Sequence, residues 1–88
     1  MSTIRVVEVT RGHIRVQVGD RSLTIQGEGH LPAPGSPGYL IYANSIRAWD
    51  PPHQSDALDL AQKKDILTGV LRHFDAKGTH YTVEGEPT

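Results

Sequence analysis

A two-residue alternation of apolar and polar side chains between positions 14 and 26 constrains the fold of this chain more than any other feature. The apolar members of the pattern are Ile14, Val16, Val18, Leu23 and Ile25. This period is typical of strands that bury one face and expose the other. Gly19-Asp20 separates the two runs and predicts a two-residue hairpin turn, in which Gly19 supplies a positive φ.

Further strands are indicated on both sides of this hairpin. Residues 4–10 are rich in β-branched side chains and precede Arg11-Gly12, which predicts a three-stranded antiparallel meander. Residues 29–38 contain three prolines and three glycines and predict an exposed loop. The apolar run 39–43 predicts a strand buried on both faces, and residues 81–84 alternate again in a final strand.

One helix is expected at residues 59–77. Asp59 and Gln62 have the spacing of a capping box, and Gly78 stands where a left-handed C-cap is expected. Gly69 costs about 1 kcal/mol in a helix relative to Ala, and we expect it to allow a close approach to the sheet. An apolar stripe at intervals of three and four residues consists of Ile66, Leu67, Val70, Leu71 and Phe74.

The order of these elements is β-β-β-loop-β-α-β, and it predicts the α+β class. We expect an antiparallel sheet of four to five strands with one helix packed on one face, because both elements must bury an apolar surface. The length of 88 residues corresponds to a single small domain, residues 1–88. The exposed Pro/Gly loop 29–38 would lie within it, and the tail after residue 85 would be loose.

Composition narrows the range of functions. There is no Cys, which removes disulfides, thiol nucleophiles and thiolate metal sites. No apolar run approaches the roughly 18 residues that span a bilayer, and no signal-peptide pattern is present. We therefore predict a cytoplasmic protein without a membrane segment. The formal net charge of −1 gives no electrostatic argument for nucleic-acid binding.

The sequence contains no catalytic constellation. The five histidines show neither a helical i, i+4 pair nor a His-x-His strand pattern, so no metal site is predicted. No serine lies in a Gly-x-Ser-x-Gly elbow. Gly27-Glu28-Gly29 precedes a Pro-rich loop instead of a helix, which excludes a phosphate-cradling loop. We expect no enzymatic activity, no cofactor and no catalytic residue.

Arg5 and Arg15 are candidates for a small basic stripe on neighbouring strands. Nucleic-acid recognition by such a stripe would require stacking aromatics beside the arginines, and none is present. A solvated sheet face is the simpler interpretation.

The segment 39–53 is unusual because it combines aromatic residues with Pro51-Pro52. Two interpretations of Trp49 are open: the ring fills the core where sheet meets helix, or it is presented to a partner. Aromatic and Arg side chains are enriched at interface hot spots, and proline lowers the entropy lost on binding. The predicted partner-contact residues are Arg47, Trp49, Asp50 and His53.

The same segment, with the core Ile41-Tyr-Ala-Asn-Ser-Ile-Arg-Ala-Trp-Asp-Pro-Pro-His53, resembles the immunity protein 74 family of bacterial polymorphic toxin systems. Thr24-Ile-Gln-Gly-Glu28 and the helix at 66–74 followed by Tyr81-Thr-Val-Glu84 agree with this resemblance. It implies a non-enzymatic protein that binds and neutralises a toxin encoded nearby. Recognition through a free sheet edge is an alternative to the segment, and a self-associating homo-oligomer is a rival function.

Overall fold

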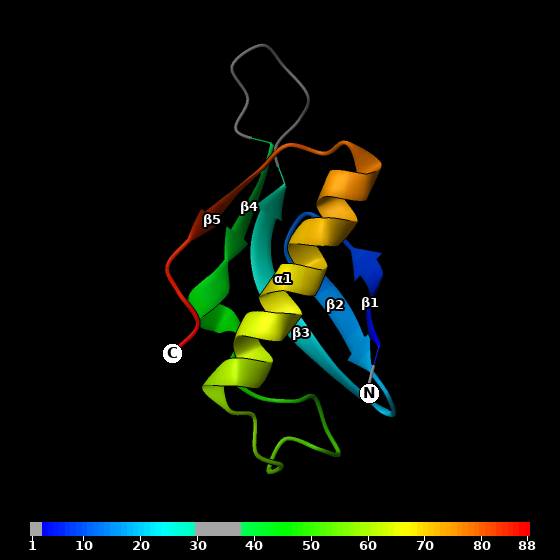
Figure 1. The fold of residues 1–88 in the computed structure, drawn as a ribbon, viewed down its shortest axis with the longest axis vertical. Coiled ribbons are helices and arrows are strands. Elements are labelled where there is room, and N and C mark those ends of the chain that lie inside the picture. Colours follow the sequence, from blue (N-terminus) through cyan, green and yellow to red (C-terminus); the bar gives the residue numbers. More distant parts are fainter. Residues whose placement is uncertain (1–2, 30–37) are drawn as a thin grey trace.

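The structure, a computed structural model, describes residues 3–29 and 38–88. Figure 1 shows these residues as a sheet with one long helix across it. The elements in chain order are β1 (Ile4–Val9), β2 (His13–Val18), β3 (Arg21–Gly29), β4 (Tyr39–Tyr42), the 3-10 turn η1 (Ala43–Ser45), α1 (Leu60–Lys77) and β5 (Tyr81–Glu84). Most of the predicted Pro/Gly loop, residues 30–37, lies outside the described residues.

The strands of this part of the chain form one five-stranded sheet in the order β1-β2-β3-β4-β5. The predicted α+β fold with one helix on the sheet is confirmed. The sheet is mixed, however, and not wholly antiparallel as expected: β4 and β5 are parallel, with Tyr39 opposite Tyr81. A parallel pair needs a crossover connection, and the segment containing α1 supplies it.

The β2–β3 hairpin forms as predicted. Gly19 has φ 63°, and Val18 pairs with Arg21 across the two-residue turn. β1 joins the meander with a bulge at Val7, where the register shifts between Val6 and Glu8. A bulge bends an edge strand and limits pairing along it.

Both predicted signals at the ends of α1 are confirmed. The Asp59 side chain accepts from the backbone of Gln62, and the Gln62 side chain accepts from the backbone of Asp59. Gly78 adopts a left-handed conformation at φ 68°. In the middle of the helix, a β-carbon on Gly69 would lie 2.7 Å from Cγ2 of Ile4. Gly69 therefore lets α1 approach β1 closely, as the sequence indicates.

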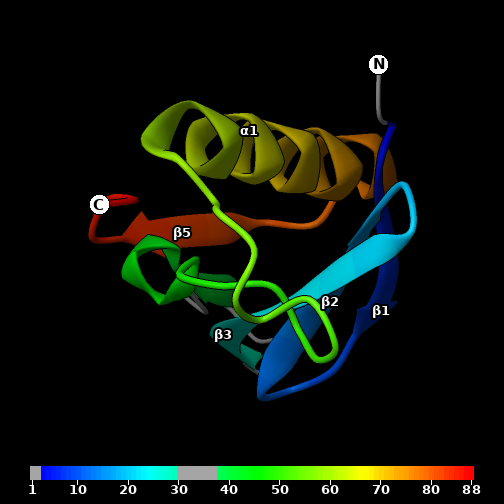
Figure 2. The same cartoon turned by 90° about the horizontal axis from the view of Figure 1, so that it is seen from below.

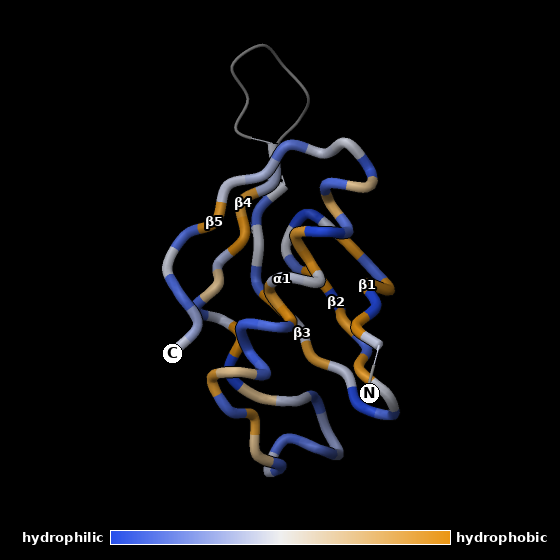
Figure 3. The backbone as a smooth tube through the Cα atoms, viewed as in Figure 1, coloured by the Kyte–Doolittle hydropathy of each residue, from blue (hydrophilic) through white to orange (hydrophobic). Residues whose placement is uncertain are grey.

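The core lies between α1 and one face of the sheet (Figure 2). Figure 3 shows apolar residues in the strands interrupted by hydrophilic ones, as expected for a sheet with one buried face. Strand β4 follows this rule and is not buried on both faces: Tyr39 and Ile41 are buried, whereas Leu40 and Tyr42 are only partly so. The fully buried core side chains include Ile14, Val16, Leu23, Ile25, Ile41, Ile46, Ile66 and Val70.

Candidate partner interface

The segment between η1 and α1 closes one end of the two layers (Figures 1 and 2). It also covers the part of β3 that β4 leaves unpaired, because β4 pairs only with Gly27–Gly29. The backbone N–H of Asp50 donates to the Ser22 carbonyl at 2.8 Å, and the Gln26 N–H donates to Ser45 Oγ at 2.8 Å. The end of η1 and the segment that follows it are therefore held against the outer edge of β3 at two points, one through Ser45 and one through Asp50.

Trp49 is part of the core, with 4% of its surface exposed. Its Nε1–H donates to the Ala57 carbonyl at 3.3 Å, and the Arg21 guanidinium lies 5.9 Å from the ring centroid. Of the two interpretations open at the sequence level, the structure supports the core position. The indole does not project toward a partner, because burying it against sheet and helix removes a large apolar surface from water.

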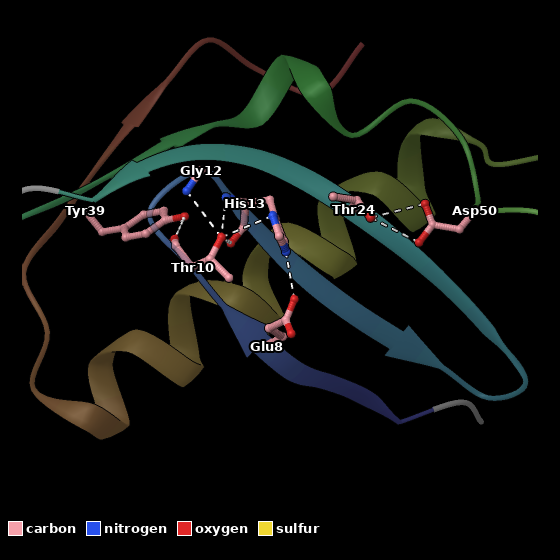
Figure 4. Close-up of polar contacts among 7 residues, drawn as sticks. All are labelled: Glu8, Thr10, Gly12, His13, Thr24, Tyr39 and Asp50. Carbon is pink, nitrogen blue, oxygen red and sulfur yellow. Dashed lines mark hydrogen bonds and ion pairs between the residues drawn. The ribbon is translucent and has the colours of Figure 1, made fainter.

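Asp50 is half-buried beside the polar face of β3. Its carboxylate accepts from Thr24 Oγ1 at 3.1 and 3.2 Å (Figure 4). It also accepts from Ser22 Oγ at 3.4 Å. No lysine, arginine or histidine among the described residues forms an ion pair with it. Strand hydroxyls, which are neutral donors, thus hold this carboxylate in place.

His53 follows Asp50 after Pro51-Pro52 and belongs to a second polar group. Its backbone N–H donates to the Asp50 carbonyl at 3.0 Å, and its Nδ1 lies 3.1 Å from Asp56 Oδ2. The same Asp56 oxygen forms an ion pair with Arg21 Nη2 at 3.1 Å. Arg21 Nε is buried and makes no hydrogen bond with the described residues. One carboxylate therefore holds both a histidine and the arginine that lies over Trp49.

Arg47 forms no hydrogen bond or ion pair with this group. Its side chain is exposed, and its Nε donates to the Asn44 carbonyl at 3.1 Å. Together with Gln26, Asn44 and Ser45 it lines a pocket of 230 Å³. The structure thus joins Asp50 and His53 through a backbone hydrogen bond and places Arg47 beside a separate pocket that Gln26 of β3 also lines.

Three residues of this surface were missed by sequence reasoning: Arg21, Thr24 and Asp56. Thr24 could have been recognised as a residue of the polar face of β3, because it alternates with Leu23 and Ile25. The pairing of Arg21 with Asp56 joins positions 35 residues apart, and no local pattern indicates it.

A different polar cluster lies at the β1–β2 turn (Figure 4). His13 Nε2 is 2.8 Å from Glu8 Oε1, and this hydrogen bond lowers the pKa of Glu8, with a further contribution from Arg15. Glu8 also stands opposite Arg15 in the sheet. The predicted basic stripe is interrupted by this carboxylate, which supports the interpretation of a solvated sheet face.

Within residues 3–29 and 38–88, no three histidines or carboxylates stand close enough together to hold a metal ion. In the same ranges, no helix has both the length and the apolar character needed to cross a bilayer.

A sequence model of the family described as immunity protein 74 matches residues 6–84. The chain belongs to the immunity protein 74 family. The match covers β2, β3, β4, α1 and β5 in full and β1 from Val6 onward. No curated protein and no solved structure matches the chain significantly. Membership indicates a toxin-neutralising role and a toxin partner, and immunity proteins are in general non-catalytic.

Proposed function

We propose that this protein neutralises one cognate toxin by binding it as a stoichiometric partner and occluding it, without any catalytic step of its own. The match to the immunity protein 74 family over residues 6–84 carries this proposal. The protein would act in the cytoplasm, where a toxin of the same cell would meet it.

The surface proposed for the toxin is the exposed side of the segment between η1 and α1, with Arg47, Asp50 and His53 as contact residues. Each is fixed before binding: Arg47 by the Asn44 carbonyl, Asp50 by Thr24, and His53 by Asp56. Side chains that are already ordered lose less entropy when a complex forms. Trp49 supports this surface from beneath and is not itself a contact.

Opposite charges at Arg47 and Asp50 would serve mainly to select the partner. Complementary charge steers association and rejects wrong partners, because like charges brought together cost free energy. An interface of ordinary size covers about 800 Å² on each partner. This area would extend from the segment onto the neighbouring polar face of β3.

Native mass spectrometry tests the proposal. The chain is mixed with an inactivated form of the protein encoded immediately upstream, and we expect a stable one-to-one complex. Free chain alone, or only a self-oligomer, would contradict the proposed function and favour a self-associating structural domain.

Variants then test the surface. We expect Arg47→Ala and His53→Ala to weaken the complex, because both remove contacts of the segment. Arg72→Ala on α1 is the matched control, since Arg72 is exposed and lies outside the segment. Equal affinities for all three variants would show that the toxin binds elsewhere, for example at a free sheet edge.

A further inference from the structure

The pocket beside Arg47 contains more hydrogen-bond donors than the protein itself uses. Its volume is 230 Å³, and its lining consists of Gln26, Asn44, Ser45 and Arg47. These residues come from two elements far apart in sequence, since Gln26 lies in β3 and the others lie in or directly after η1. The pocket therefore exists only in the folded protein.

The base of the pocket is fixed by Ser45. Its Oγ accepts from the Gln26 backbone N–H at 2.8 Å and donates to the Tyr42 carbonyl at 2.6 Å. The Ser45 hydroxyl proton is thus already donated to Tyr42 and is not free to bind a ligand. This arrangement joins η1 to β3 and sets the separation between the two walls.

The walls carry the unused donors. Arg47 donates through Nε to the Asn44 carbonyl, which orients the guanidinium and leaves its two Nη groups without a partner among the described residues. The side-chain amides of Asn44 and Gln26 likewise make no hydrogen bond with any described residue. A guanidinium and two amides together offer several N–H donors to one small volume.

The charge of the pocket is positive, because Arg47 is the one ionised residue in its lining. The carboxylates of Glu28 and Asp50 keep their charge, because they accept only from neutral hydroxyls, Glu28 from Tyr42 at 3.1 Å and Asp50 from Thr24. Neither forms an ion pair with Arg47, so the guanidinium is not neutralised by a carboxylate of the described residues. Arginine binds a carboxylate through two parallel hydrogen bonds. One positive charge with neutral amide donors suits a singly charged carboxylate.

We propose that this pocket receives the carboxylate of an acidic side chain of the toxin, held by the Arg47 guanidinium and the amides of Gln26 and Asn44. The inference rests on the proposed function for its occupant. It goes further by naming the chemistry that the toxin must present at this point, namely an Asp or Glu side chain.

The pocket is tested first without the toxin, by titrating the ¹⁵N-labelled protein with sodium acetate against sodium chloride at equal ionic strength. We expect saturable shifts, specific to acetate, at the side-chain amides of Gln26 and Asn44 and at Arg47 Nε. Arg47→Gln should abolish them. Shifts that are absent, that chloride reproduces, or that persist in Arg47→Gln would overturn the carboxylate pocket.

The complex tests the occupant. Arg47→Glu should lower the affinity for the inactivated upstream protein by about 30-fold or more, the effect of a hot-spot contact. Arg72→Glu, with the same charge change on α1, should lower it far less, and circular dichroism verifies that both variants fold. Equal losses of affinity in Arg47→Glu and Arg72→Glu would overturn the assignment of the pocket to a toxin carboxylate. Failure of the wild-type protein to form any complex would overturn the proposed function, while the acetate titration would still decide the pocket.

Discussion

The phenol ring of Tyr39 lies directly against the α-carbon of Gly27, on the strand next to its own. A β-carbon at position 27 would be 2.7 Å from the Tyr39 hydroxyl oxygen and 2.9 Å from Cζ. The ring crosses β3 at this point, and its hydroxyl donates to the Thr10 carbonyl at 2.7 Å (Figure 4). Glycine is therefore required at position 27 for lack of space, although the backbone there is that of an ordinary strand.

Gly27→Ala should destabilise the protein by about 1–3 kcal/mol, the usual cost of forcing extra volume into a packed site. Urea unfolding followed by circular dichroism measures this loss. Gly12→Ala is the matched control, because a β-carbon at Gly12 meets nothing within 4 Å. Combining Gly27→Ala with Tyr39→Leu should cost less than the sum of the single changes. Strict additivity would mean that the ring does not limit position 27.

Tyr39→Phe should lower the free energy of unfolding by about 1 kcal/mol, because the hydrogen bond to Thr10 is lost. Burial also raises the pKa of Tyr39 above its ordinary value of 10.0. The neutral phenol thus stabilises the fold fully below pH 10.0, and this contribution disappears as the pH rises through the folded-state pKa. Above pH 10.0 the wild type should lose stability more steeply than Tyr39→Phe. If the free energies of unfolding of the wild type and Tyr39→Phe ran parallel from neutral to alkaline pH, this prediction would be contradicted.

Trp49→Ala should cost about 3–5 kcal/mol, as truncation of a buried aromatic usually does. That is a large part of the stability of a small domain, so the variant will be substantially unfolded at room temperature. Tryptophan emission in the wild type should be that of a buried ring and should shift to the red on unfolding. A folded, fully stable Trp49→Ala protein would show that the indole is not part of the core.

Thr24→Val should destabilise the protein by about 1–2 kcal/mol, because Asp50 loses its closest donor while the shape of the side chain is kept. Thr82→Val on β5 is the control: Thr82 is exposed, and such changes usually alter stability by less than about 0.5 kcal/mol. Hydrogen exchange at the Asp50 amide, which bonds to Ser22, should become faster in Thr24→Val alone. Unchanged exchange would mean that the segment is held by other contacts.

Elements that depend on neighbours in the chain were predictable from the sequence. The capping box of Asp59 and Gln62, the left-handed Gly78 and the turn at Gly19 all form as expected. In each case, the group that satisfies the backbone, or the glycine that relieves it, lies within a few residues. The buried residues of α1 likewise follow from helical spacing alone.

The position of Trp49 could not be settled in this way. An aromatic ring shortly before two prolines can lie on the surface or fill the core. Which of the two positions it takes depends on the space between α1 and the sheet. The structure places it inside, with Arg21 over the ring. The candidate interface changes accordingly: its proposed contact residues are the exposed Arg47 and the half-buried Asp50 and His53, and Trp49 lies beneath them in the core.

The sequence by itself determined the order of the elements, the two ends of the helix and the buried faces of β2 and β3, since these depend on period and on local hydrogen bonds. Tertiary structure alone decided that β5 runs parallel to β4, that Tyr39 rests on Gly27, and that Gln26 meets Arg47 in one pocket. These relationships join residues distant in the chain. Their free energies depend on which surfaces meet, and a local pattern of residue types does not contain that information.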